Sequence, residues 1–148
     1  MILLKRGLRM NSQFEMKVTF PGVGHRVDVQ YGPHTFCTDT AVEKGGQGEY
    51  MTPGSYFLGA IAACTGSAVL SFIEKRDLKI EDMRVIYHAN TETSMVERIE
   101  VKVMVDETFP KKYLPALERS AETCWVKRQW KNAPDVAIMA EVVNGASK

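Results

Sequence analysis

Three cysteines are the strongest nucleophiles in this sequence, and they stand at Cys37, Cys64 and Cys124. They lie 27 and 60 positions apart without a C-x-x-C pair, and the one histidine within four residues of any of them is His34. This spacing does not favour a zinc site. An odd number of cysteines also argues against a secreted disulfide framework. Free thiol chemistry is therefore the first hypothesis.

Cys64 lies in the middle of an uncharged segment, residues 51–73, which the sequence predicts to be a helix. Thr52 is a candidate N-cap and Pro53 a candidate first helical residue. About 20 apolar residues can span a bilayer, but the proline, the glycines and the hydroxyl residues of this segment do not favour a membrane span. Small residues on every side of a helix predict close packing all round. One subunit can hardly cover such a helix, so we expect a homodimer with this helix at its centre.

Cys124 falls on the apolar face of a second predicted helix. Leu114, Leu117, Ala121 and Cys124 recur at helical spacing, and charged residues take the opposite face. Two helices of one small domain pack on the same sheet, so Cys64 and Cys124 can meet there. A disulfide requires Cα atoms within about 4.4–6.8 Å of each other. From the residues alone, two interpretations stay open: a redox pair, or two small buried apolar side chains.

The strands that must position these helices follow from period-two alternation of apolar and polar residues. The expected strands are residues 14–20, 27–31, 34–38, 85–89, 98–105 and 135–143. The first three predict an antiparallel meander, and strands interrupted by two helices without a βαβ repeat predict the α+β class. The polar, glycine-rich loop 39–52 is long enough to suggest a function. We expect one domain over residues 14–148 after a flexible N-terminal extension, residues 1–13.

The composition excludes several classes of function. The chain has 148 residues and a net charge of +1, from 19 Lys and Arg against 18 Asp and Glu. No field of one sign draws it to nucleic acid or to an anionic membrane. Trp125 and Trp130, among basic residues, are interpreted as a packed helix end rather than a nucleic-acid site. No phosphate-binding glycine motif occurs, so we expect no cofactor. The apolar run at the N-terminus is too short for a signal peptide, and we expect a cytoplasmic protein.

The segment PGSYFLGAIAACTG, residues 53–66, resembles the cysteine-bearing helix of the OsmC/organic hydroperoxide resistance family. In that family a proline precedes the reactive cysteine by eleven residues, as Pro53 precedes Cys64 here. The turn at residues 77–80, the strand at 99–105 and the segment ending at Cys124 match in the same order. The resemblance covers residues 14–143, almost the whole chain.

The resemblance implies an OsmC-like α+β fold, with antiparallel sheets around a long central buried helix, in an intertwined homodimer. It also implies thiol-dependent reduction of organic hydroperoxides without a cofactor. Cys64 then corresponds to the peroxidatic cysteine and Cys124 to the resolving cysteine. A thiolate attacks the peroxide and becomes a sulfenic acid, which the second thiol converts to a disulfide. An external dithiol partner reduces that disulfide by exchange.

Two positions depart from the family pattern. Gly54 stands where peroxidase members carry a Glu that helps to fix an activating arginine, and Trp125 stands where a proline usually follows the resolving cysteine. A thiol needs a nearby cation to ionise at neutral pH. Arg26 is the candidate for this cation and the third expected catalytic residue, with His25 and Arg128 as alternatives.

Two functions therefore stay open. The first is a hydroperoxide-reducing thiol peroxidase, and the alternative is a non-catalytic or differently specialised small-molecule-binding or stress-response protein on the same fold. Cys37 is expected to have no catalytic role, because Phe36 takes the core face of its strand and leaves Cys37 on the other face.

Overall fold

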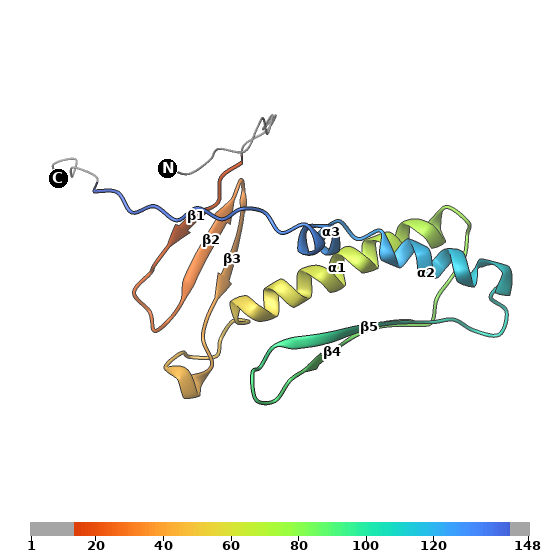
Figure 1. The fold of residues 1–148 in the computed structure, drawn as a ribbon, viewed down its shortest axis with the longest axis horizontal. Helices are drawn as coiled ribbons and strands as arrows, with labels where there is room; N and C mark the ends of the chain where they lie inside the picture. The colour runs from red at the N-terminus through yellow and green to blue at the C-terminus, as the bar shows by residue number, and fades with distance from the viewer. Residues whose placement is uncertain (1–13, 143–148) are drawn as a thin grey trace. The chain divides into compact units, whose positions relative to one another are not determined.

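The computed structural model describes residues 14–142. In this part of the chain there are three α-helices and two small antiparallel sheets, which confirms the predicted α+β class (Figure 1). The chain falls into two compact units that divide between Phe57 and Leu58. The expected extension, residues 1–13, lies outside the described residues. The elements are β1 (Lys17–Thr19), β2 (Val27–Tyr31), β3 (His34–Thr38), α1 (Pro53–Glu74), β4 (Asp82–Ala89), β5 (Val96–Met104), α2 (Leu114–Glu122) and α3 (Trp125–Lys131).

The first unit contains the predicted meander. Strands β1, β2 and β3 pair in this order, with Val29 opposite both Val18 and Phe36. Strand β1 is shorter than the expected segment 14–20, and Phe20 next to it is 77% exposed. The expectation of a half-buried strand is wrong here, because no further layer of the described first unit covers β1.

The loop between β3 and α1 is organised by a buried carboxylate. Asp39 is 3% exposed, and its two oxygens accept the backbone N–H groups of Thr40 at 2.7 Å and of Gln47 at 2.9 Å. These bonds hold the pKa of Asp39 below its usual range. A Cβ at Gly46 would lie 1.8 Å from the carbonyl oxygen of Thr40, so only glycine fits there. The long loop is thus a defined structure, which includes a short 3₁₀ turn at Val42–Lys44.

Helix α1 begins as the sequence predicts. Thr52 caps it, because its Oγ1 accepts the backbone N–H of Ser55 at 3.2 Å, and Pro53 is the first helical residue. The helix buries one stripe, made of Ile61, Thr65, Val69, Phe72 and Ile73. By length and composition it could cross a membrane, and 28% of its most apolar window is buried. A single chain therefore leaves most of this uncharged helix uncovered, as the sequence anticipates.

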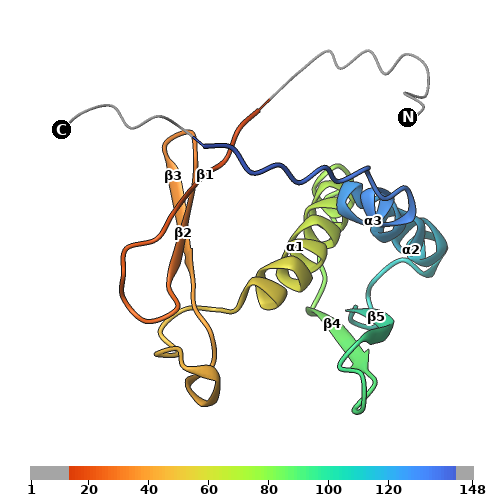
Figure 2. The same cartoon turned by 60° about the vertical axis from the view of Figure 1, so that its left-hand side comes forward.

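The core of the second unit lies between α1, α2 and the β4–β5 hairpin. Its buried side chains are Val69, Phe72, Ile73, Phe109, Leu117 and Ala121. Helix α2 lies beside the C-terminal half of α1 in both Figure 1 and Figure 2, and these residues join the two helices. The hairpin pairs antiparallel over eight residue pairs, with Val85 opposite Val101. The sheet thus supports the surface on which both cysteine-bearing segments lie.

The predicted second helix is divided in two. Helix α2 ends at Glu122, Cys124 is the N-cap of α3, and the backbone of Cys124 is extended with φ −53° and ψ 120°. Leu117, Ala121 and Cys124 are all buried, so the predicted apolar face is confirmed. Cys124 nevertheless sits at a junction between helices rather than within one.

The expected last strand, residues 135–143, is not formed in the described part of the chain. Residues 133–142 have no regular secondary structure, and Figure 2 shows an extended segment after α3. Ile138 is 92% exposed and Val142 is 95% exposed. A strand requires hydrogen-bonding partners, and no described strand pairs with this segment. Val143 lies outside the described residues.

Candidate active site

The two predicted site cysteines occupy different positions in the second unit. Cys64 is in the middle of α1 and is half-buried, whereas Cys124 is 1% exposed at the start of α3. The chain turns at Cys124 because Thr123 ends α2, where its hydroxyl donates to the carbonyl of Ser120 at 2.7 Å. Packing of α2 on α1 then brings together two residues that are 60 positions apart in the sequence.

The Cys64 side chain lies close enough to Cys124 to lower the pKa of the Cys124 thiol, and both cysteines are free thiols. The Cys124 sulfur also accepts the backbone N–H of Lys127 at 3.4 Å, and it interacts with the hydroxyl of Thr65. The two cysteine side chains therefore influence each other, and their roles as a redox pair stay a prediction. What two thiols in contact can do chemically is to form and break a disulfide.

The surroundings of Cys124 favour its thiolate. Burial raises the pKa of the Cys124 thiol, but the hydrogen bonds from Cys64, from the Lys127 amide and from Thr65 outweigh burial and hold this pKa below its ordinary value. Hydrogen bonds to the charged form of a group favour that form. The groups that lower this pKa are thus neutral groups of the chain, which the sequence reasoning did not consider.

Thr65 is a site residue that the sequence reasoning missed. Its side chain is fully buried, and its hydroxyl donates to the carbonyl of Ile61 at 2.7 Å. That carbonyl is also within reach of the helical backbone N–H four residues on. The hydroxyl can therefore turn from Ile61 to the Cys124 sulfur without leaving the carbonyl unpaired. The sequence feature that could have indicated Thr65 is its polar side chain directly after Cys64, at helical spacing from the apolar residues Ile61 and Val69.

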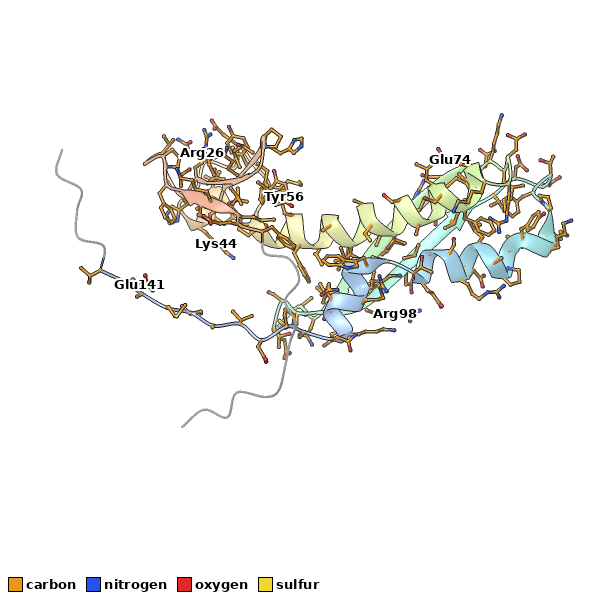
Figure 3. All side chains as sticks on the ribbon, turned by 90° about the horizontal axis from the view of Figure 1, so that it is seen from above. Arg26, Lys44, Tyr56, Glu74, Arg98 and Glu141 are labelled. Atoms are coloured by element: carbon orange, nitrogen blue, oxygen red, sulfur yellow. The ribbon has the colours of Figure 1, made fainter. Side chains whose placement is uncertain are left out.

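Arg26, the predicted activating cation, lies in the first unit, where Figure 3 labels it. Its guanidinium makes two bonds to Asp28, at 2.7 and 3.0 Å, donates to the Cys37 sulfur at 3.4 Å and stacks over the ring of Tyr50 at 5.1 Å. The bond with Asp28 raises the pKa of Arg26 and lowers that of Asp28. A role of Arg26 toward Cys64 stays a prediction.

Cys37 sits beside this ion pair. A hydrogen bond to Asp28, followed by burial, raises the pKa of the Cys37 thiol, although the positive charge of Arg26 opposes this. A raised pKa leaves little thiolate and little reactivity. The surroundings of Cys37 therefore agree with the expectation that it has no catalytic role.

The two alternative cations also differ in position. His25 is exposed and lies next to Gly45 in the first unit. Arg128 is in the same unit as both cysteines, one turn after Cys124, and its backbone N–H donates to the Cys124 carbonyl at 3.2 Å. Its exposed side chain lines a small groove with Glu122, Lys127 and Lys131.

A larger groove of about 540 Å³ runs between β5 and α2 in the second unit. Lys127 borders it, with the Nζ atom donating to the carbonyl of Ala121 at 2.7 Å. Its remaining lining residues are Val101, Lys102, Val103, Leu114, Leu117, Glu118 and Glu122. An apolar floor with charged rims can take a small organic molecule. Among the residues that the structure describes, no group of His, Cys, Asp or Glu could hold a metal ion.

Comparisons with known proteins agree on one fold. The family model described as OsmC-like protein matches residues 46–139. A proposed osmotic stress induced and detoxification response protein of Psychrobacter arcticus has a TM-score of 0.64 at 18% sequence identity, over 82% of this chain and 91% of that chain. An OsmC-like protein of Mycoplasma pneumoniae has a TM-score of 0.59 at 10% identity, over 84% and 91% of the two chains.

An OsmC-like protein of unknown function from Vibrio cholerae is also similar in fold. It has a TM-score of 0.57 at 12% identity, over 80% of this chain and 93% of that chain. No curated protein matches the sequence. At these identities the likeness to solved structures concerns the fold alone.

Proposed function

This chain belongs to the OsmC-like protein family, and from that premise we propose that it is a thiol peroxidase that reduces organic hydroperoxides with Cys64 and Cys124. The observation that supports this most directly is the proximity of two free thiols, in which Cys64 helps to lower the pKa of Cys124. A sulfenic acid formed on one of these cysteines has the other within reach.

The proposed reaction has three steps. The Cys64 thiolate attacks the outer oxygen of the hydroperoxide, the O–O bond breaks, and the alcohol leaves with one proton while Cys64 becomes a sulfenic acid. The Cys124 thiolate then attacks the Cys64 sulfur, hydroxide leaves and is protonated to water, and a disulfide forms. An external dithiol reduces the disulfide and is itself oxidised to a disulfide.

The order of these roles follows from exposure. A substrate must reach the first sulfur, and Cys64 is half-exposed whereas Cys124 is 1% exposed. The second sulfur must be an anion when the sulfenic acid appears, and Cys124 is the cysteine with the lowered pKa. Arg26, held by Asp28, is the proposed cation that helps Cys64 to ionise.

The test is consumption of an alkyl hydroperoxide with a dithiol as reductant. We expect turnover by the wild type, none by Cys64→Ser, and turnover by the matched control Cys37→Ser. Cys124→Ser is expected to perform the first step once and to stop as a Cys64 sulfenic acid, which a dimedone-type probe labels. Absence of hydroperoxide consumption by the wild-type protein at millimolar substrate would remove the proposal.

A second candidate is ligand binding without turnover. It is supported by Gly54 and Trp125, the two departures from the family pattern, and by the groove between β5 and α2. Mild peroxide followed by mass spectrometry separates the candidates. Loss of two hydrogens between the peptides that carry Cys64 and Cys124 supports the redox function, and unmodified thiols support binding.

We also propose that the protein acts as a homodimer in the cytoplasm, where its thiols are kept reduced. The exposed Leu70 of α1 and Ile138 of segment 135–142 support the dimer, because a second copy can cover such apolar side chains. Figure 3 shows Glu141 on this extended segment. Sedimentation analysis should give a dimer for the wild type and a weaker one for Ile138→Asp, with Gln129→Asp on the exposed side of α3 as the control.

A further inference from the structure

The two sulfurs of the proposed disulfide lie in unequal surroundings. Cys64 is half-exposed on α1, whereas Cys124 is buried where α2 and α3 meet. Three neutral groups of the chain besides Cys64 act on the Cys124 sulfur: the backbone N–H of Lys127 at 3.4 Å, the backbone N–H of Val126 and the hydroxyl of Thr65. The Lys127 amide is fixed by the first turn of α3, so it keeps its direction when the redox state changes.

We propose that the external reductant attacks the sulfur of Cys64 and that Cys124 is the leaving group. This inference rests on the proposed function, because it concerns the disulfide which that function forms. The reductant thiolate makes a new sulfur–sulfur bond to Cys64 while the bond between Cys64 and Cys124 breaks. The bonding electron pair leaves with Cys124, which becomes a thiolate.

The second thiol of the reductant completes the reaction. As a thiolate it attacks the reductant sulfur that is bound to Cys64, and the electron pair of this mixed disulfide returns to Cys64. Cys64 is released as a thiolate that takes up a proton from water. The dithiol has lost two electrons and two protons in all, and the protein disulfide has gained the two electrons.

Access favours attack at Cys64. A thiolate approaches a disulfide on the side of the attacked sulfur that faces away from the leaving sulfur. For Cys64 the attacking thiolate can come from solvent, since this side chain is only partly buried. Cys124 is only 1% exposed, so the attacking thiolate has no open approach to its sulfur.

The stability of the leaving thiolate also favours attack at Cys64. Exchange is faster when the departing thiol forms the more stable thiolate. The Lys127 amide already donates to the Cys124 sulfur, and the Thr65 hydroxyl can meet the developing negative charge by turning away from the Ile61 carbonyl. Attack on Cys124 would instead place this charge on Cys64. Access and leaving-group stability therefore select the same sulfur.

The experiment identifies the mixed disulfide. The wild-type protein is oxidised with diamide, which makes the disulfide without using any peroxidase activity. An excess of an isotope-labelled monothiol, 2-mercaptoethanol, is then added, samples are stopped with acid at intervals, and free thiols are alkylated with a maleimide. Trypsin releases the three cysteines on separate peptides, residues 27–44, 45–75 and 120–127.

We expect the labelled monothiol on peptide 45–75 to exceed that on peptide 120–127 by about tenfold or more. Equal labelling, or an excess on peptide 120–127, would overturn the inference, and so would failure of diamide to join the two peptides. Because diamide rather than a hydroperoxide forms the disulfide, the labelling result does not depend on hydroperoxide turnover. A protein that maps as expected but consumes no hydroperoxide would refute the proposed function alone.

Discussion

Substitution of Thr65 by valine tests how the chain controls the acidity of Cys124. Valine keeps the shape of threonine but lacks the hydroxyl that interacts with the Cys124 sulfur. Thr65 is fully buried, so no water can replace the lost donor. Thr65→Ser is the matched control, because it keeps the hydroxyl and removes only a methyl group.

The expected magnitude follows from the lost hydrogen bond. A hydrogen bond to a charged group contributes about 1.5–3 kcal/mol, and one pKa unit corresponds to about 1.4 kcal/mol. When Cys124 ionises, the hydroxyl gives up its bond to the Ile61 carbonyl, which we take to offset about 0.5–1.5 kcal/mol. We therefore expect Thr65→Val to raise the pKa of Cys124 by about one unit and Thr65→Ser to change it little.

The assay is the pH dependence of the Cβ chemical shift of labelled cysteine in NMR spectra. Three cysteines give three resonances, which Cys→Ser variants assign. Unfolding in urea is measured alongside, and Thr65→Val should change the free energy of unfolding by about 1 kcal/mol or less, because an apolar methyl replaces a hydroxyl in an apolar site. The pKa and the stability are thus separate readouts.

A Cys124 pKa that stays the same in a folded Thr65→Val protein would refute this reasoning. It would mean that Cys64 and the backbone amides of Lys127 and Val126 stabilise the thiolate without Thr65. An equal rise in Thr65→Val and Thr65→Ser would also refute it, since serine retains the donor.

Three further predictions concern the first unit and the start of α1. Arg26→Gln should lower hydroperoxide turnover by about tenfold or more, whereas Arg84→Gln, which breaks a more exposed ion pair with an aspartate two residues away, should not. Gly54→Glu should stabilise α1 by about 1 kcal/mol in urea unfolding, because glycine is a poor helix former and an acid favours the first turn; a Cβ there has its nearest neighbour at 3.9 Å. The pKa of Asp39 is lowered in the folded state, so its contribution to the stability of the fold is complete above its unfolded-state pKa and is lost as the pH falls through its folded-state pKa. The free energy of unfolding of Asp39→Asn should therefore depend less on pH in acid than that of the wild type.

Each of these predictions has a contradicting result. Equal turnover losses in the two arginine variants would show a general effect of charge rather than a role for Arg26. Gly54→Ala separates helix propensity from charge, and a destabilised Gly54→Glu beside a stabilised Gly54→Ala would contradict the helix-terminus argument. An acid dependence identical in Asp39→Asn and wild type would show that other carboxylates control acid unfolding.

Local patterns predicted most elements of the fold. The N-cap at Thr52 and the proline after it located the start of α1, and alternation located β2, β3 and β5. These features depend on residues that are close together in the sequence, so the sequence alone can predict them. The break at Cys124 was missed, because an apolar residue at helical spacing suits a junction between two helices as well as a helix interior.

Strand partners were harder to predict than strands. The alternation in residues 14–20 and the β-rich segment 135–143 were interpreted as strands, but β1 covers three residues and residues 133–142 form none. Alternation records which side chains could be buried, whereas a strand also requires a backbone partner. The described residues of one chain contain no such partner for the last segment.

By itself, the sequence determined that Cys64 stands in an uncharged helix and that Cys124 is on an apolar face, because spacing and residue type are local properties. The tertiary structure decided that Cys64, Thr65 and the Lys127 amide act on the Cys124 sulfur, and that Asp28 holds Arg26. The physical reason is that contacts over 60 residues depend on how α1 and α2 pack side chain against side chain. That packing is set by the shapes of the whole core, which no local pattern records.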